Sequence, residues 1–415
     1  MDLELLSVGT ELLLGEIVDT NAAYLAEKLS GLGVNVYHKT TVGDNAARLA
    51  AALRTILGRA DVVLATGGLG PTEDDITAAA VAEVMGADLV ADEAAAERIR
   101  SFARQRGLKA LDGLLKQARV PRGSIVVTNP VGTAPGFILV RDGKAVIALP
   151  GVPAEMKAMA EQTVLPYLGG RVQREGAAVI LSRVLRLAGL GESQAEAEIA
   201  DLLGSRNPTV APLAKTYEVH LRISARAPDR AAAQAMIAPL EAEIRHRLGE
   251  HVFGADEETL EAVAGQMLRE AGKTLAVAES CTGGLIGHRI TNVPGSSDYL
   301  LASLVTYSDQ TKIRLLGVPA ETIATHGAVS AETAQAMAEG VRKACGADIG
   351  LSVTGIAGPT GATAPKPVGL TYVGIADGET SRVEEHRLRG DRPMVKERAA
   401  QMALYLLYRR LKGAA

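Results

Sequence analysis

The sequence has few aromatic residues, few cysteines and no long hydrophobic run. It contains no tryptophan, and aromatic residues make up only 3% of it, which argues against a base-stacking platform for single-stranded nucleic acid. Two cysteines in 415 residues exclude a disulfide framework and are typical of a reducing compartment. No apolar run reaches the length that spans a membrane. We therefore expect neither nucleic acid nor a membrane as partner.

Charge and length narrow the class of protein further. A formal net charge of −4 gives no general attraction to nucleic acid or to anionic lipid. The first residues, MDLELLSVG, lack the basic region of a signal peptide, so we expect a cytoplasmic protein. The histidines show no metal-ligand spacing, which argues against a structural zinc site. The length predicts about two or three globular domains.

The first 168 residues alternate between expected strands and helices. The expected strands are Leu3–Val8, Val34–Thr40, Asp61–Thr66, Ile125–Thr128 and Ala145–Leu149, and the expected helices are Thr20–Leu32, Ala46–Leu57 and Ile76–Met85. This order predicts a mostly parallel sheet with helices on both faces.

Two further segments follow a predicted linker at Gly169–Gly176. Residues 177–253 read as a small α+β domain, with strands at Val179–Leu187, near Thr209–Pro212 and at Glu218–Ser224, and a helix through Arg247. Residues 257–413 form a third α/β domain, whose last helix begins near Pro393, a favoured first-turn position.

The third domain carries a small-residue loop between a strand and a helix. The loop, Ser280–Gly284, lies between the expected strand Lys273–Glu279 and the expected helix Leu285–Thr291. Backbone N–H groups at the positive end of a helix dipole stabilise an anion or an oxyanion. Ser280 is thus a candidate nucleophile, Lys312 a candidate base, and Thr282 and Tyr307 candidate assistants.

Other interpretations of these residues remain open. Ser280 is also a good residue to cap a helix. Lys312 is also an ordinary surface lysine, and a lysine base must be neutral, although the usual lysine pKa is about 10.4. Cys281 is a rival nucleophile, but no histidine follows nearby, and free cysteine usually behaves as a small buried hydrophobe.

Two more strand ends of this domain carry hydroxyls, glycines or an amine. They are Leu304–Lys312, with Tyr307, and Asp348–Gly361. Open α/β sheets bind ligands at the carboxyl ends of their strands. We therefore expect the three strand ends to form one pocket.

The first domain has a glycine-rich turn with an acidic helix start, ATGGLGPTEDDIT at Ala65–Thr77. Glycines let the backbone approach a phosphate, and Asp74 and Asp75 are suitable ligands for a hard divalent cation. Ser7–Glu11 and Asp44 follow other strands and are expected at the same edge. Alternatively, the acidic cluster only complements the dipole of its helix.

Together these motifs resemble the CinA family over nearly the whole chain. SVGTELLLGEIVDTN, ATGGLGPTEDDIT, NPVGTAPGF and LPGVPAEM resemble its N-terminal domain, which is similar to the MoaB/MogA molybdopterin-binding fold. That fold has a GGTG pattern, and here Leu69 replaces the threonine, which fits the CinA branch and argues against molybdopterin chemistry. AVAESCTGGLIGHRIT, VPGSS, VTYSDQTK and VTGIAGPTG resemble its C-terminal domain, which is similar to PncC.

The resemblance implies two hydrolase activities and a fold for each segment. Residues 1–168 would be a MoaB/MogA-like α/β sandwich with metal-dependent ADP-ribose pyrophosphatase activity, and residues 257–413 an α/β amidase domain. The amidase converts nicotinamide mononucleotide and water to nicotinic acid mononucleotide and ammonia, in pyridine nucleotide recycling. The middle segment resembles a KH-type domain, but it has no GxxG and so lacks the RNA clamp. The resemblance also implies a homodimer.

The predicted sites are as follows. The catalytic residues of the amidase, which needs no cofactor, are Ser280, Lys312, Tyr307 and Thr282, and its substrate-binding residues are Cys281, Gly283, Gly284, Thr354, Gly355, Ala357 and Gly358. The pyrophosphatase would bind substrate through Thr10, Gly67, Gly68 and Thr72, and a divalent cation (Mg, Mn or Co) through Asp74, Asp75, Glu11 and Asp44. The alternative for this domain is a non-catalytic scaffold that binds a pterin or a nucleotide.

Overall fold

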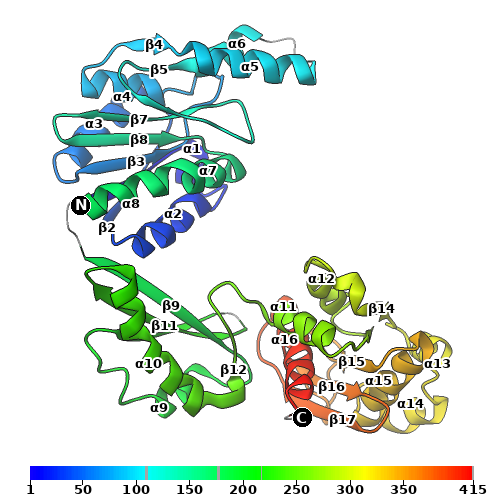
Figure 1. The fold of residues 1–415 in the computed structure, drawn as a ribbon. Coiled ribbons are helices and arrows are strands. Elements are labelled where there is room, and N and C mark those ends of the chain that lie inside the picture. Colours follow the sequence, from blue (N-terminus) through cyan, green and yellow to red (C-terminus); the bar gives the residue numbers. More distant parts are fainter. Residues whose placement is uncertain (108–110, 175–177, 216, 414–415) are drawn as a thin grey trace. The chain divides into compact units, whose positions relative to one another are not determined.

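The computed structural model describes residues 1–107, 111–174, 178–215 and 217–413 and is drawn in Figure 1. Backbone contacts divide the chain into two compact units, Met1–Ser182 with Ala225–Ala235, and Arg183–Ser224 with Met236–Ala415. Over the described ranges, no helix is both long enough and apolar enough to cross a membrane.

The N-terminal domain is built on a six-stranded sheet with the order β2-β1-β3-β8-β7-β6. Its strands are β1 (Asp2–Val8), β2 (Asn35–Val42), β3 (Val62–Thr66), β6 (Ile125–Val127), β7 (Gly136–Arg141) and β8 (Lys144–Leu149). β2, β1, β3 and β8 run parallel to one another. β7 runs antiparallel to both of its neighbours, β8 and β6. The predicted mostly parallel sheet is confirmed, with β7 as an additional strand.

Helices cover both faces of this sheet, as the sequence pattern predicts (Figure 1). One face packs against α2 (Thr20–Gly31), α7 (Pro153–Met159) and the π-helical segment η2 (Ala160–Val164), which continues into α8 (Leu165–Arg174). The other face packs against α3 (Ala46–Leu57) and α4 (Thr77–Met85). The predicted linker at Gly169–Gly176 is wrong up to Arg174, because Leu168 and Val172 anchor α8 in the core; residues 175–177 lie outside the described residues.

A small appendage extends the N-terminal domain. It consists of β4 (Leu89–Ala91) paired with β5 (Arg119–Pro121), the helices α5 (Glu93–Arg106) and α6 (Leu111–Leu115), and the turn η1 (Lys116–Ala118). A one-turn helix, α1 (Thr10–Leu13), follows β1.

The middle domain is a four-stranded sheet with the order β10-β11-β9-β12. Its elements are β9 (Val179–Leu187), α9 (Glu192–Glu198), β10 (Thr209–Ala214), β11 (Val219–Ala227), α10 (Arg230–Leu248), η3 (Gly249–His251) and β12 (Val252–Ala255). Alternate residues of β11 are buried, which is typical of a sheet with one face in a core. The predicted α+β domain is confirmed.

The C-terminal domain is a five-stranded sheet between two helical layers. The sheet order is β14-β13-β15-β16-β17, made of β13 (Leu275–Glu279), β14 (Leu300–Val305), β15 (Ile349–Gly355), β16 (Leu370–Ala376) and β17 (Ser381–Arg387). β13 is parallel to β14 and β15, and β16 and β17 are antiparallel additions.

The two faces of this sheet bury alternate residues of β13. Val277 packs with α11 (Leu260–Glu270), α12 (Leu285–Thr291) and α16 (Arg392–Leu411). Ala276 and Ala278 pack on the other face with α15 (Ala331–Cys345) and the end of α13 (Asp309–Leu316). The remaining elements are η4 (Ser296–Asp298) and α14 (Ala320–His326).

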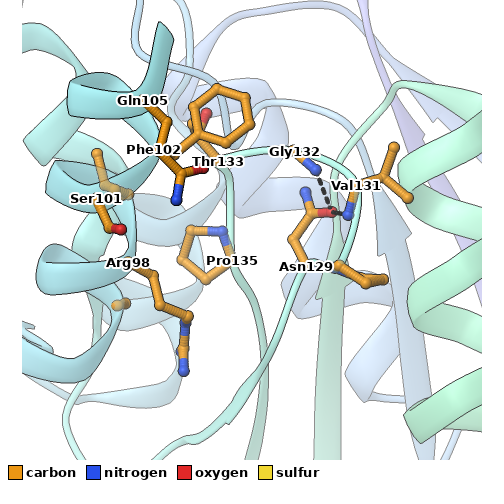
Figure 2. Close-up of a pocket in the computed structure, with 12 residues that line it drawn as sticks. Arg98, Ser101, Phe102, Gln105, Asn129, Val131, Gly132, Thr133 and Pro135 are labelled. Carbon is orange, nitrogen blue, oxygen red and sulfur yellow. Dashed lines mark hydrogen bonds between the residues drawn. The ribbon is translucent and has the colours of Figure 1, made fainter.

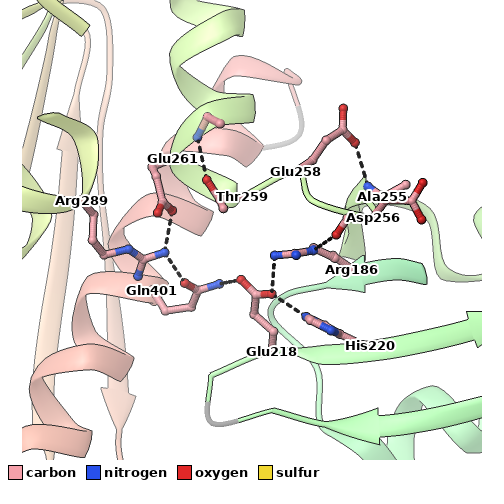
Figure 3. Close-up of polar contacts among 11 residues, drawn as sticks. Arg186, Glu218, His220, Ala255, Asp256, Glu258, Thr259, Glu261, Arg289 and Gln401 are labelled. Carbon is pink, nitrogen blue, oxygen red and sulfur yellow. Dashed lines mark hydrogen bonds and ion pairs between the residues drawn. The ribbon is translucent and has the colours of Figure 1, made fainter. Parts of the chain in front are cut away.

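A chain of polar side chains joins elements of the second unit (Figure 3). Glu218 accepts from Gln401 of α16 at 3.2 Å and lies 2.9 Å from the His220 ring. Arg289, in the last turn of α12, donates to Gln401 at 2.8 Å and to Glu261 at 2.7 Å. α12 is thus held at its C-terminal end by hydrogen bonds to α11 and α16.

Candidate active sites

Three strand ends of the C-terminal domain meet at one edge of the sheet. Glu279, the last residue of β13, is in register with Val305 of β14 and Val353 of β15. The Ser280 N–H donates to the Val353 carbonyl at 3.0 Å, and the Thr306 N–H donates to the Glu279 carbonyl at 2.9 Å. The structure therefore brings the three predicted loops together.

Ser280 and Lys312 lie side by side although they are far apart in sequence. Ser280 lies in the turn after β13, and Lys312 lies on α13, which Ser308 caps through its hydroxyl. The Lys312 Nζ is 3.3 Å from the Ser280 Oγ, 2.9 Å from the Thr306 carbonyl oxygen and 3.3 Å from the Tyr307 carbonyl oxygen. The Ser280 and Lys312 side chains therefore form a pair at the sheet edge.

Burial lowers the proton affinity of this lysine. Lys312 is only 1% exposed, and Ser280 is 8% exposed. Desolvation lowers the pKa of Lys312 below its usual value, although Asp309 nearby opposes the change. A neutral amine has two N–H donors and one lone pair. The two carbonyls can take the donors, and the lone pair then faces the Ser280 hydroxyl, which is the arrangement of a base.

Glu279 occupies the position expected for a bound anion at the start of α12. Its buried carboxylate accepts from the N–H groups of Gly284 at 2.9 Å, Ile286 at 3.1 Å and Gly287 at 2.9 Å, and from the Ser303 hydroxyl at 3.0 Å. This carboxylate satisfies the N–H groups of the helix start and complements its dipole. The helix start is therefore already occupied.

The expected oxyanion donors change as a result. The Gly284 N–H binds Glu279, and the Gly283 N–H donates to the Ser280 carbonyl at 3.1 Å. These two N–H groups are not available to a substrate, which corrects the prediction for them. Among the described residues, the N–H groups of Cys281 and Thr282 donate to no backbone oxygen, which leaves them as the candidate donors of this loop.

The other predicted side chains of this site have different surroundings. Thr282 is fully buried, and among the described residues its hydroxyl has no hydrogen-bond partner. The Cys281 side chain packs in the core, where burial raises the pKa of its thiol to about 12, so it is a poor nucleophile. Tyr307 is 59% exposed, and its hydroxyl accepts from Arg392 at 3.0 Å.

The third loop approaches the first through its backbone. A Cβ at Gly355 would lie 3.1 Å from the Cys281 sulfur and 2.7 Å from the Thr371 hydroxyl, so only glycine fits. Arg392 also donates to the Gly358 carbonyl at 2.8 Å. Ala357 and Thr354 are buried, and the Thr354 hydroxyl donates to the Ala328 carbonyl at 2.7 Å, which assigns that hydroxyl to loop packing.

All the predicted residues of the N-terminal domain except Thr10 line one cavity of about 520 Å³. Its wall includes Glu11, Asp44, Gly67, Gly68, Thr72, Asp74 and Asp75. Gly67 must be glycine, since its φ is +99° and a Cβ would lie 2.1 Å from the Val8 carbonyl oxygen. The three strand ends β1, β2 and β3 therefore converge as the sequence predicts.

Two of the acidic residues are engaged by threonines. Asp44 accepts from the Thr10 N–H at 2.9 Å and the Thr10 hydroxyl at 2.8 Å. Asp75 accepts from the Thr72 N–H at 2.8 Å and the Thr72 hydroxyl at 2.7 Å. Across the described ranges, no three acidic, histidine or cysteine side chains converge closely enough to hold a metal ion. The four predicted carboxylates therefore do not form a metal site by themselves in this structure.

A second cavity of about 230 Å³ lies beside the first, between α5 and the loop that precedes β7 (Figure 2). Thr133 lines both cavities. Asn129 fixes the loop, because its Oδ1 accepts from the N–H groups of Val131 at 3.0 Å and Gly132 at 2.8 Å. Its Nδ2 donates to Glu155 at 2.7 Å.

Three residues of these sites were not predicted from the sequence: Glu279, Gln117 and Glu155. Glu279 directly precedes the loop, and an acidic residue before a glycine-rich helix start was an available signal. Nothing in the local sequence marks Gln117, whereas Glu155 belongs to the LPGVPAEM motif, in which its acidic side chain was not assigned to the site.

Three family models match the chain in succession. They are the probable molybdopterin binding domain at residues 4–170, the damage-inducible protein CinA KH domain at 182–254 and the CinA C-terminal domain at 257–411. The chain is thus a three-domain protein with a MoaB-like domain, a KH domain and a C-terminal α/β domain.

Full-length relatives agree with this order. A competence-damage inducible protein of Moorella thermoacetica is 48% identical over 413 residues, which cover 100% of this chain and 99% of that protein. A CinA-like protein of Dictyoglomus turgidum is 48% identical over 412 residues, with 99% of each chain covered. The crystal structure of CinA from Thermoplasma acidophilum is 40% identical and covers 39% of this chain and 94% of that chain, with a TM-score of 0.36. The chain belongs to the CinA family of competence-damage inducible proteins.

Proposed function

We propose that the C-terminal domain is an amidase that converts nicotinamide mononucleotide and water to nicotinic acid mononucleotide and ammonia. Ser280 is its nucleophile and Lys312 its general base. The observation that supports this proposal is the buried amine of Lys312, 3.3 Å from the Ser280 hydroxyl. A desolvated lysine with a lowered pKa beside a hydroxyl is the pairing that activates a serine.

The reaction proceeds in two halves. The Ser280 Oγ bonds to the carboxamide carbon while its proton moves to the Lys312 Nζ, and the N–H groups of Cys281 and Thr282 receive the oxyanion. The C–N bond then breaks, and Lys312 gives its proton to the leaving nitrogen, which departs as ammonia. Water, deprotonated by Lys312, attacks the acyl-serine; the C–O bond to Ser280 breaks, Lys312 returns the proton to the Ser280 Oγ, and the acid leaves as its carboxylate with loss of a proton to solvent.

Residues at the rim would orient the substrate. Tyr307 is exposed at the end of the second loop and holds Arg392, which also binds the third loop at Gly358. This cation at the mouth of the site is suited to the phosphate of a mononucleotide. The Thr282 hydroxyl is buried and has no hydrogen-bond partner among the described residues, so it is available to the bound substrate rather than to the loop.

The test of this proposal is ammonia release by a Ser280→Ala variant. We expect the variant to fold normally and to lose at least about a hundredfold of the wild-type rate, because removal of a nucleophile has large effects. The matched control is Ser308→Ala, which removes a hydroxyl that caps α13 and should keep most of the activity. A Ser280→Ala protein with the full rate would exclude the mechanism.

We infer for the N-terminal domain a metal-dependent pyrophosphatase that cleaves ADP-ribose. The phosphates would lie on the glycine-rich turn at Gly67 and Gly68, with Glu11 and Asp74 toward the cation. A divalent cation of the Mg, Mn or Co type would supply charge neutralisation to the pyrophosphate. Thr10 and Thr72 shape the site by holding Asp44 and Asp75.

A scaffold that binds a pterin or a nucleotide without turnover is the alternative for this domain. Incubation of the whole protein with ADP-ribose and Mg²⁺ separates the two, since a scaffold leaves ADP-ribose intact. We further propose a homodimer, which size-exclusion chromatography with light scattering tests directly.

A further inference from the structure

The middle domain packs on helix α16 of the C-terminal domain, within the second compact unit. Ala188 and Phe253 of the middle domain belong to the same apolar core as Tyr405 of α16. Gly189 must be glycine, because its φ is +79° and a Cβ would lie 2.1 Å from the Tyr405 ring. The Tyr405 hydroxyl also lies 3.0 Å from the His251 ring. The middle domain can therefore hold side chains of α16 in place.

Glu218 of the middle domain fixes the orientation of a buried amide on α16 (Figure 3). Gln401 is only 1% exposed. Its Nε2 donates to the Glu218 Oε1 at 3.2 Å, and its Oε1 accepts from the Arg289 Nη2 at 2.8 Å. An ionised carboxylate only accepts hydrogen bonds, and a guanidinium only donates them. One orientation of the amide alone satisfies both partners, so Gln401 links Glu218 to Arg289.

Loss of Glu218 would break this link at both ends. The Gln401 NH₂ group would be buried without an acceptor, which is unfavourable. Rotation of the amide toward another acceptor would withdraw its oxygen from Arg289. The second side chain that holds Arg289 in the described structure is Glu261, at 2.7 Å. Arg289 would then lose one of these two anchors.

Helix α12 transmits such a change to the loop Ser280–Gly284. The helix has only seven residues, about 10 Å in length, and so moves as a rigid rod. Arg289 lies in its last turn, and the Gly287 N–H in its first turn donates to Glu279 at 2.9 Å. A shift at the Arg289 end therefore displaces the other end and the loop that joins it to β13. The N–H groups proposed to receive the oxyanion belong to this loop, and such donors are effective only when they are held in place.

We propose that Glu218 is a positioning residue for the amidase and acts through Gln401, Arg289 and α12 on the oxyanion donors. This role rests on the proposed amidase function. It gives the middle domain, which has no GxxG and lacks the RNA clamp of KH domains, a part in catalysis: it holds the nucleophile loop of the neighbouring domain in its active arrangement.

The test measures kcat and KM for ammonia release from nicotinamide mononucleotide by the full-length protein. We expect Glu218→Ala to lower kcat about tenfold and to keep KM within about twofold, because the donors act in the transition state rather than in substrate binding. Glu218→Gln keeps an oxygen that accepts from Gln401. It should restore kcat to within about threefold of the wild-type value.

Glu250→Ala is the matched control. Glu250 is another glutamate of the middle domain that contacts α16, through Arg409 at 3.5 Å, but this contact does not lead to α12. Its loss weakens the same junction and should leave kcat within about twofold of wild type. Gln401→Met keeps the length of the side chain and removes both hydrogen bonds. It should show the same tenfold loss, and it provides the test if Glu218→Ala does not fold.

Amide hydrogen exchange reports on α12 without any activity. Glu218→Ala should speed exchange in the segment Ser280–Thr291 at least about threefold, and Glu250→Ala should not.

Several outcomes would overturn the proposal. They are an unchanged kcat or unchanged exchange in Glu218→Ala, a loss of equal size in Glu250→Ala, a change confined to KM, and a Glu218→Gln protein as slow as Glu218→Ala. A wild-type protein that releases no ammonia would contradict the amidase, and exchange would then decide by itself whether Glu218 holds α12.

Discussion

Replacement of Lys312 by methionine tests the reaction mechanism and the local structure together. Methionine keeps the length and the apolar stem of lysine but has neither a charge nor a lone pair on nitrogen. Lys312 is almost completely buried, so a methionine can occupy the same space. Arginine is less suitable here, because its larger head would overpack the site.

The magnitudes follow from the contacts of the amine. A positioned general base contributes about 10²–10⁴ in rate, so we expect kcat for ammonia release to fall at least a hundredfold. The carbonyls of Thr306 and Tyr307, which now bind the amine at 2.9 and 3.3 Å, lose a donor. Each carbonyl that is left without a donor and out of reach of water costs about 1–3 kcal/mol of stability. Methionine also removes the cost of burying an amine, and this gain offsets part of the loss.

The dependence on pH gives this prediction its sign. Burial lowers the pKa of Lys312 from its usual value of 10.5, so the neutral base forms, and the wild-type rate rises, at a lower pH than for an exposed lysine. Between pH 10.5 and the lowered pKa of the folded state, the lysine of the unfolded protein binds a proton that the lysine of the folded protein does not. The wild type therefore loses stability relative to Lys312→Met as the pH falls from 10.5 to the lowered pKa.

The assays are ammonia release across pH and denaturant unfolding at pH 7 and pH 10. The double variant with Ser280→Ala is the control, since groups that act as one unit are strongly non-additive. We expect it to be no slower than either single variant. If Lys312→Met keeps more than a tenth of kcat, or if the two losses multiply, Lys312 is not the base for Ser280.

Three further predictions concern the loops and the metal. Glu279→Gln should destabilise the protein by about 1–3 kcal/mol in denaturant unfolding, since an amide NH₂ would face backbone N–H donors; unchanged stability would show that the cap is dispensable. Exhaustive chelation should abolish ADP-ribose cleavage and leave ammonia release unchanged, as product masses will show; loss of both, or of neither, would contradict separate sites. Gly67→Ala should lower the melting temperature strongly, because its Cβ would lie 2.1 Å from the Val8 oxygen, whereas Gly31→Ala, which has open space around it, should not.

The sequence predicts the parallel parts of the N-terminal and C-terminal sheets because most such strands are apolar runs next to amphipathic helices; the polar edge strand β2 is the exception. The strands predicted from the sequence do not include the antiparallel strand β7. This strand follows a loop rich in glycine and proline, which obscures where it begins. Yet it is joined to β8 by Asp142 and Gly143, both with positive φ, and this dipeptide is a strong hairpin signal. Residue-level turn chemistry was therefore sufficient to find β7.

The Ser280–Lys312 pair was predictable in identity but not in environment. The spacing of the motifs placed both residues at strand ends, and the sheet register brings those ends together. Lys312 is buried because of its contacts with Thr306 and Tyr307 and the packing of α13. These contacts belong to the tertiary structure and cannot be read from the local sequence.

Acidic residues at the two sites stabilise the loops that carry them. A sequence pattern does not distinguish this structural role from a catalytic or metal-binding role. Asp75 closes the glycine-rich turn by binding Thr72. Glu279 closes the loop Ser280–Gly284 by binding the start of α12. Because Glu279 already neutralises that helix start, the dipole of α12 has little left to offer a reaction intermediate. In the proposed mechanism, stabilisation of the oxyanion then falls to the N–H groups of Cys281 and Thr282. The rigidity that Glu279 gives the loop keeps these donors in place before the substrate arrives, which is the condition under which such donors are effective.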